Sequence, residues 1–311
     1  MLVNSVSFWM FFIAVLAPYW WAAARQSAKW QNAILLIGSY YFYAQASWKM
    51  CFLLAIATCV FYGLGILIEK QNQRNEKRAS WLTNLGVCLG VGLLVYFKFL
   101  EFFIDEFAHL LNTIGLHTNM SSFGIIMPLG ISFFTFKLIS YVVEVHREHI
   151  PASRNIVDFG VFIAFFPTIM SGPIDRPNQF LPQLETTRPF SYDQVREGAK
   201  RILWGMFLKM CIADQLSGYT DTVLMNYSYH NASSILLAIF LYAFQMYTDF
   251  CGYSDMALGV GQMMGIQIRE NFHRPFWSQN VAEYWRRWHM SLGTWFKKYI
   301  YFPIAMTNWN R

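Results

Sequence analysis

The chain has 311 residues, of which 55% are hydrophobic, 19% are aromatic and only 14% are charged. Soluble domains average about 25% charged residues, so this composition excludes an ordinary soluble domain. It predicts an all-α fold, a polytopic transmembrane helical bundle with interfacial and re-entrant helices. The five cysteines have no metal or redox spacing, and the net charge of +6 lies mostly in loops between apolar runs. We therefore expect no metal and no nucleic-acid partner.

Seven apolar runs approach the roughly 20 residues that a membrane-spanning helix requires. In chain order they cover residues 6–24, 33–47, 52–68, 82–99, 123–145, 156–170 and 234–250. The shorter runs are expected to be tilted, broken or re-entrant. The first run has no basic region before it and no small-residue cleavage site after it, which indicates a retained helix rather than a signal peptide.

The basic residues alternate between successive loops. They follow the first, third and fifth runs, as Arg25, Lys29, four residues of loop 69–80, Arg147 and Arg154. The intervening turn near Ala46 and the segment 101–122 carry little positive charge. Because basic loops stay on the cytoplasmic side of a membrane, this pattern predicts an N-terminus on the outer face.

Two segments of the second half depart from simple apolar runs. Residues 165–184 hold four of the ten prolines, so they cannot form one continuous helix. They are predicted to be a helix end, a structured loop and a short surface segment. In residues 192–211 four basic residues alternate with apolar ones, as in an amphipathic helix at the membrane interface whose basic side chains snorkel.

The stretch EYWRRWHMSLGTWFKKY at residues 283–299 places two arginines and a histidine among tryptophans. At a helix centre Arg286 and Arg287 together would cost roughly 5 to 7 kcal/mol, so they must lie at an interface or face a polar cavity. If the segment is one helix, its tryptophans, Trp288 among them, form one apolar stripe. His289 then lies at the border between this stripe and a row that starts with an arginine.

This pattern admits more than one function. An aromatic-belt helix that anchors the chain at the lipid headgroups needs no chemistry. A histidine beside arginines also suits acyl or phosphoryl transfer, in which the histidine is a general base and the arginine holds an anionic group. It equally suits a proton relay in a transporter.

A second group of polar residues lies upstream, in YTDFCGYSDMALGVGQMMG at residues 247–265. Asp249 and Asp255 lie at or near the end of an apolar helix, so they must be hydrogen-bonded, paired or solvated. Their nearest basic neighbours in the sequence are Arg269, Arg274, Arg286 and Arg287. No strand precedes the glycine pattern, which therefore predicts close helix packing rather than a nucleotide loop.

The strings DFCGYSDMALGVGQMMG, ENFHRPF and EYWRRWHMSLGTWFKKYIYFP, in this order, resemble the signature region of the membrane-bound O-acyltransferases. The resemblance is greatest to the bacterial branch that contains alginate O-acetyltransferases and teichoic-acid D-alanyltransferases, and it covers most of the chain from Met127 onward. It implies a single membrane-embedded acyltransferase domain over residues 1–311. The N-terminal transmembrane helices would occupy residues 1–122 and the acyltransferase core residues 123–311.

The resemblance implies transfer of an acyl group, in particular acetyl, from a cytoplasmic thioester donor to a hydroxyl of an exported or cell-wall polysaccharide. The donor would be acetyl-CoA or an acyl-carrier protein, and no cofactor would be tightly bound. His289 would be the catalytic residue of the site. The implied substrate-binding or supporting residues are Arg286, Arg287, Asp249, Asp255, Asn271 and Trp288.

The resemblance also implies a multi-pass protein of the bacterial cytoplasmic (inner) membrane. Its partners would be membrane lipids and an extracytoplasmic acyltransferase or polysaccharide-export protein. Two features depart from the family pattern. Lys297 and Lys298 stand where relatives often have a basic residue followed by an acid. In this branch a second histidine, near a later motif of the form G-x-W-H-G, is the usual candidate general base, and His289 would position or activate a reactant. No such motif follows before Arg311, so we expect a chain truncated at its C-terminus and inactive alone.

Two other functional classes remain open on sequence grounds. A transporter or channel would line a permeation path with histidine, arginine and aspartate, although transporters often carry related halves and no such repeat is found here. A noncatalytic scaffold would fit a chain that is naturally this short.

We predict that loop 69–80 lies in the cytoplasm, because it holds four basic residues against two acids between two long apolar runs. Single cysteines placed in this loop should react with a membrane-impermeant thiol reagent only after the inner face is opened. Efficient labelling of intact cells would reverse the orientation.

Overall fold

The computed structural model describes residues 3–114 and 126–309, and all regular secondary structure within them is helical. Within these ranges, four helices are long and apolar enough to cross a membrane. They are α1 (Val6–Ala24), α3 (Trp48–Asn72), the continuous helix Glu76–Thr113 and α11 (Ala232–Met263). The all-α, polytopic fold class expected from the composition is therefore confirmed.

Local sequence determines where many of the helices begin. Seven of the described helices begin after a serine or asparagine whose side chain accepts a hydrogen bond from a backbone N–H two or three residues further on. This is the preferred way to satisfy one of the free donors at a helix start. The capping residues are Ser5, Ser47, Asn75, Asn155, Ser191, Asn231 and Asn280.

The chain forms two compact units whose segments interleave along the sequence. Unit 1 consists of Met1–Leu35, Ser171–Asp175 and Pro182–Arg311, and unit 2 of Leu36–Met170 and Arg176–Leu181. The boundary between them falls inside α2 (Ala28–Ala44) and inside α8 (Pro177–Glu185). The division predicted between residues 122 and 123 lies outside the described residues and stays a prediction.

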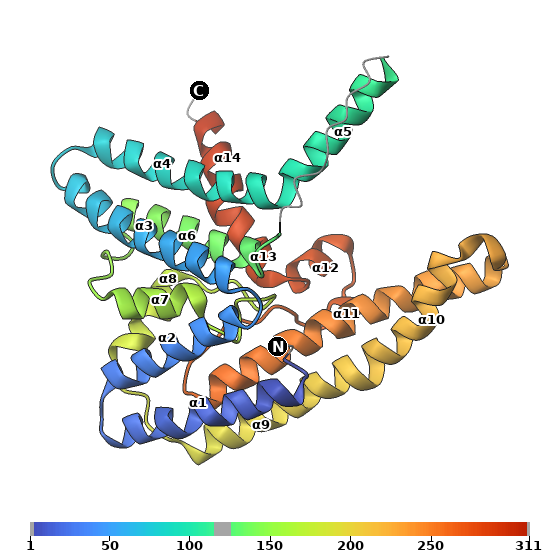
Figure 1. The fold of residues 1–311 in the computed structure, drawn as a ribbon, viewed down its shortest axis with the longest axis horizontal. Coiled ribbons are helices and arrows are strands. Elements are labelled where there is room, and N and C mark those ends of the chain that lie inside the picture. Colours follow the sequence, from blue (N-terminus) through green and yellow to red (C-terminus); the bar gives the residue numbers. More distant parts are fainter. Residues whose placement is uncertain (1–2, 115–125, 310–311) are drawn as a thin grey trace. The chain divides into compact units, whose positions relative to one another are not determined.

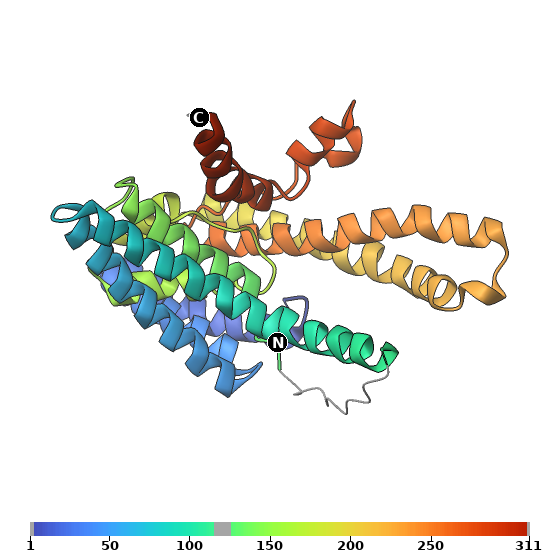
Figure 2. The ribbon, with the colours of Figure 1, turned by 90° about the horizontal axis from the view of Figure 1, so that it is seen from above.

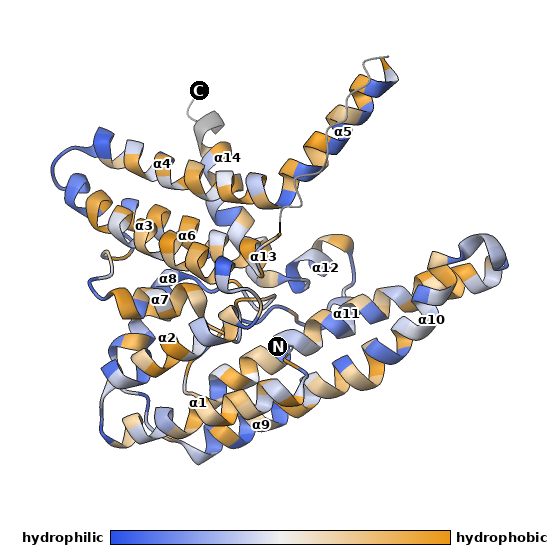
Figure 3. Ribbon diagram, in the orientation of Figure 1, coloured by the Kyte–Doolittle hydropathy of each residue, from blue (hydrophilic) through white to orange (hydrophobic). Residues whose placement is uncertain are grey.

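Unit 2 is built around α6 (Ile131–His146), which packs against α3 and α4 (Glu76–Leu94) (Figure 1). Figure 3 shows that α3 and α6 are mostly apolar, and α6 completely buries Phe134, Leu138 and Tyr141. The π-helix η1 (Val95–Phe99) and α5 (Leu100–Thr113) continue α4 without a break.

The prediction that the proline-rich residues 165–184 do not form one continuous helix is confirmed. Helix α7 (Ile156–Ala164) ends before it, and the segment continues as a loop to the start of α8. The loop is an interior element, because Phe165, Phe166 and Ile169 are fully buried. The buried ammonium of Lys137 donates to the carbonyl of Phe162, in the last turn of α7, at 3.1 Å. This bond satisfies one of the carbonyls that a helix end leaves free.

Unit 1 contains a long pair of antiparallel helices. One is the run of α9 (Tyr192–Met206), η2 (Phe207–Ala213) and α10 (Asp214–Met225), and the other is α11. Figures 1 and 2 show the two runs side by side from two directions. Unit 1 also holds α1, the 3-10 helices η3 (Tyr227–Tyr229) and η4 (Pro275–Trp277), α12 (Val281–Arg287), α13 (Met290–Phe296), η5 (Lys297–Tyr301) and α14 (Phe302–Trp309).

Two pairs of glycines bring α9 and α11 into backbone contact. A Cβ atom on Gly205 would lie 2.6 Å from the carbonyl oxygen of Gly252, and one on Gly259 would lie 2.6 Å from that of Gly198. Small residues at a helix crossing allow such close approach in membrane proteins. The close packing predicted from Gly259, Gly261 and Gly265 is therefore confirmed at Gly259, whereas Gly198, Gly205 and Gly252 were not part of that pattern.

We predict that Gly205→Ala destabilises the protein by about 1–3 kcal/mol, because the new methyl group meets backbone that cannot yield without separating the helices. The unfolding temperature in detergent should fall. Gly218→Ala is the matched control, since a Cβ at Gly218 in α10 meets nothing within 4 Å. Equal unfolding temperatures for the two variants would contradict the close contact.

Candidate active site

The segment that contains His289 is broken, so the single helix on which the expected apolar stripe was conditional does not form. Helix α12 ends at Arg287, and Trp288 is extended with a ψ angle of 129°. His289 then has the left-handed angles φ 41° and ψ 54°, and α13 begins at Met290. A left-handed residue other than glycine costs roughly 1–2 kcal/mol, so its surroundings must hold it in place.

The break dissolves the single apolar stripe expected along this segment. Trp285 is 63% exposed, whereas Trp295 is buried. Trp288 instead joins an aromatic cluster, with its ring 5.6 Å from Tyr284 in a stacked arrangement and 5.1 Å from Phe272 edge to face. The tryptophans of residues 283–299 thus lie in different environments.

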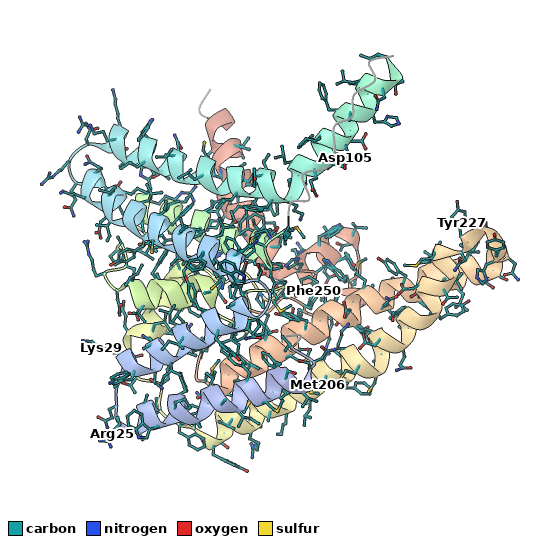
Figure 4. All side chains as sticks on the ribbon, viewed as in Figure 1. Arg25, Lys29, Asp105, Met206, Tyr227 and Phe250 are labelled. Atoms are coloured by element: carbon teal, nitrogen blue, oxygen red, sulfur yellow. The ribbon has the colours of Figure 1, made fainter. Side chains whose placement is uncertain are left out.

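The imidazole of His289 lies against α11. Its ring centroid is 4.7 Å from that of Phe250, with the planes at 84°, and Phe250 lies near the middle of α11 (Figure 4). The ring of Phe250 is in turn 5.1 Å from that of Phe272. The ring of His289 is therefore flanked by an apolar aromatic wall.

The Nε2 atom of His289 is buried and has no hydrogen-bond partner among the described residues. Burial lowers the pKa of His289 to about 4, because desolvation disfavours the charged imidazolium. The ring is accordingly neutral at physiological pH. A neutral imidazole with a free nitrogen can accept a hydrogen bond and then a proton from a bound reactant.

Asn271 holds the broken segment in place through hydrogen bonds of its backbone and its side chain. Its backbone carbonyl accepts a hydrogen bond from the N–H of Met290 at 2.8 Å. Its fully buried side chain donates to Ser254 Oγ at 3.2 Å and accepts from Ser291 Oγ at 2.6 Å. These bonds join α11 and the start of α13 through one amide, directly beside His289.

A second backbone bond lies on the other side of the break. The N–H of His273 donates to the carbonyl of Arg287 at 3.0 Å. Together with the bond to Met290, it replaces helical hydrogen bonds that the break removes. The ENFHRPF segment therefore supports the residues that flank His289.

The acids of α11 are paired across the helix pair and not with the arginines that follow them in the sequence. Arg201 of α9 lies 2.9 Å from Asp255 and 2.6 Å from Glu270, and Lys209 of η2 lies 2.5 Å from Asp249. Burial alone would lower the pKa of Arg201, but the hydrogen bonds and attraction to both carboxylates raise it overall. Arg201 and Lys209, two basic residues of the predicted amphipathic helix, are therefore ion-paired. The partners of Asp255 and Asp249 are these residues and not the downstream arginines that lie nearest in the sequence.

The two arginines of the motif differ in their surroundings. Arg287 lies 2.5 Å from Glu283 within α12, at the i, i+4 spacing that supports a helix. Glu283 also accepts a hydrogen bond from the backbone N–H of Gln279, and this bond, with the nearby arginines, lowers the pKa of Glu283. Arg286 is exposed.

Of the seven site residues predicted from the sequence, the structure groups three around the break, His289, Trp288 and Asn271. Arg286 and Arg287 lie at the end of α12, and Asp249 and Asp255 are engaged in the ion pairs with α9 and η2.

The structure adds site residues that sequence reasoning missed. Phe250, Ser254 and Ser291 carried no spacing signal, because their roles depend on pairing between distant segments. A separate cavity of about 280 Å³ around the C-terminal end of α11 has a mixed lining, which includes Gln194, Arg201 and Leu258. Within the described ranges no group of three His, Cys, Asp or Glu side chains could hold a metal ion.

Comparison with known proteins adds a family and several relatives. The model of the membrane-bound O-acyltransferase family matches residues 35–309. The probable alginate O-acetylase AlgI of Pseudomonas aeruginosa is 36% identical over 304 residues, which cover 97% of this chain and 56% of the relative. The peptidoglycan O-acetyltransferase of Helicobacter pylori is 30% identical over 303 residues, 87% of this chain and 55% of the relative.

A third relative, the teichoic acid D-alanyltransferase of Bacillus subtilis, is 36% identical over 179 residues, 56% of this chain and 44% of the relative. The chain therefore spans little more than half the length of the curated relatives that it matches across most of its own length.

The two ion pairs of α11 should differ in their contribution to stability. The side chain of Asp255 is 14% exposed and that of Asp249 is 51% exposed. We predict that Asp255→Asn lowers the free energy of unfolding by about 2 kcal/mol or more, because it leaves the guanidinium of Arg201 with a weaker buried partner. Asp249→Asn should cost less than about 1 kcal/mol. Thermal unfolding in detergent gives the order, and the reverse order would contradict the assignment.

Proposed function

Because the chain belongs to the membrane-bound O-acyltransferase family, we propose that it transfers an acyl group, in particular acetyl, to a hydroxyl of an exported or cell-wall polysaccharide. The donor is a thioester reached from the cytoplasmic side, either acetyl-CoA or an acyl-carrier protein. The names of the relatives, which refer to alginate, peptidoglycan and teichoic acid, support this class of acceptor.

The observation that carries the proposal is the neutral imidazole of His289, whose buried Nε2 atom has no hydrogen-bond partner among the described residues. In the proposed reaction this nitrogen accepts the hydrogen bond of the attacking hydroxyl and orients its oxygen toward the thioester carbonyl. The carbon–oxygen bond forms and the carbon–sulfur bond breaks. The proton of the hydroxyl passes by way of the imidazole to the departing thiolate.

The aromatic wall beside His289 supports the same chemistry. Phe250, Phe272 and Trp288 surround one side of the site with apolar rings. A thioester also reacts with water, so a transferase must keep water from the reacting carbonyl. Apolar rings next to the buried Nε2 atom of His289 favour acyl transfer over hydrolysis.

We further propose the bacterial cytoplasmic (inner) membrane as the location, with several passes through it. Four helices of suitable length and polarity support this placement. An acyl group that starts on a cytoplasmic donor and ends on an exported polymer has to cross the membrane. An extracytoplasmic acyltransferase or export protein is the partner that would complete the transfer.

We predict that His289→Ala in the full-length protein lowers the rate of acyl transfer about 100-fold to 10,000-fold, which is the usual loss when a positioned acid–base group is removed. The assay is the incorporation of labelled acyl groups into polysaccharide at matched abundance in the membrane. His273→Ala is the matched control, because His273 is exposed and supports the site only through its backbone N–H. Full activity of a folded His289→Ala variant would contradict a catalytic role and favour an aromatic-belt helix that anchors the chain at the lipid headgroups.

A further inference from the structure

We propose that Ser291 is a positioning residue that holds the imidazole of His289 in its reactive orientation, an inference that rests on the proposed function. Ser291 follows His289 by two residues, in the first turn of α13, and is 1% exposed. Its hydroxyl has no solvent to bond with. Its hydrogen bonds are therefore fixed features of the site.

The hydroxyl of Ser291 joins three segments of unit 1 at one atom. Its Oγ atom donates to Asn271 Oδ1 at 2.6 Å and accepts from the backbone N–H of Ile174 at 3.0 Å. Asn271 is fully buried and Ile174 is 2% exposed, so water cannot take the place of the hydroxyl at either partner. Without it, two buried polar groups would lose their bond.

These bonds act directly on the strained residue. His289 keeps a left-handed backbone only while the residues after it are held in place. Met290 is tied to the backbone carbonyl of Asn271 and Ser291 to its side chain. Two consecutive anchors to one buried residue therefore fix the start of α13. They leave the imidazole few ways to move away from Phe250.

The size of the effect follows from geometry. A displacement of about 1 Å at a catalytic group costs on the order of 100-fold in rate. Loss of the Ser291 hydroxyl lets the start of α13 shift while the rings that form the apolar wall remain. We therefore expect Ser291→Ala to lower kcat about 10-fold to 100-fold and to leave KM within about twofold.

The experiment is a double-mutant cycle on the full chain in membranes, with Ser291→Ala and His289→Ala alone and combined. If Ser291 acts through His289, its replacement should change the residual rate of His289→Ala by less than about threefold. Thr248→Val is the matched control and should keep parental kinetics. Thr248 is also a buried hydroxyl residue near the site, but its bonds go only to carbonyls of its own helix, those of Phe244 and Gln245.

Two results would overturn the inference. An equal loss of rate in both backgrounds would mean that Ser291 only stabilises the fold, and a raised KM at unchanged kcat would make it a substrate contact. If Ser291→Ala does not accumulate, Ser291→Thr keeps the hydroxyl and should retain most of the parental kcat, whereas Ser291→Cys, with a weaker donor, should lose it. Equal kcat for these two variants would also overturn the inference.

The same assays separate this inference from the proposed function. Acyl transfer by the parent that depends on His289 but not on Ser291 refutes only the positioning role. Absence of acyl transfer by the full-length parent protein refutes the proposed function, and the role of Ser291 with it.

Discussion

The backbone contact between α9 and α11 is the constraint on which unit 1 depends. Its two contact points, Gly198 with Gly259 and Gly205 with Gly252, set the register of the helix pair. The pair of Arg201 and Asp255 lies between these points on both helices, and that of Lys209 and Asp249 lies about one turn beyond one of them. Side chains of larger volume at the crossing would separate the helices. The charged groups would then be left unpaired on an otherwise apolar surface, where each is costly.

The same helix also supplies the site, from a different face. At roughly 100° per residue, Phe250 and Ser254 project from α11 together, about one turn apart, and on the side away from the glycines that contact α9. Phe250 contacts His289, and Ser254 accepts a hydrogen bond from the side-chain amide of Asn271. The register of α9 and α11 pairs the charges on one side of α11. It therefore also determines where along α11 the residues around His289 are attached on the other side. Helix α11 thus couples the ion pairs to the histidine that is proposed as catalytic.

Much of this arrangement could be predicted from the sequence, and the failures have a common cause. The first apolar run coincides with α1, and the proline-rich segment interrupts the helices as expected. The break at His289 was missed because aromatic, basic and apolar residues keep helical spacing through it, while its left-handed backbone is imposed by bonds to Asn271. The partners of Asp249 and Asp255 were sought nearby in the sequence, but they come from a helix that precedes α11. Local patterns contain no information on which distant segments meet.

The charges near the site explain why His289 is suited to a brief role in proton transfer. Arg201 is paired with Asp255 and Glu270, and Arg287 with Glu283, so the basic groups of these elements are largely neutralised. Burial is then what lowers the pKa of His289. An imidazole with a pKa of about 4 is a weak base, so it would not hold the proton of a hydroxyl as a stable imidazolium. Once protonated, it is a stronger acid than a thiol, for which the cysteine side chain gives a pKa of about 8.5, so transfer of the proton to a departing thiolate is favourable. The apolar wall thus favours a proton that moves together with the acyl group over a charged intermediate.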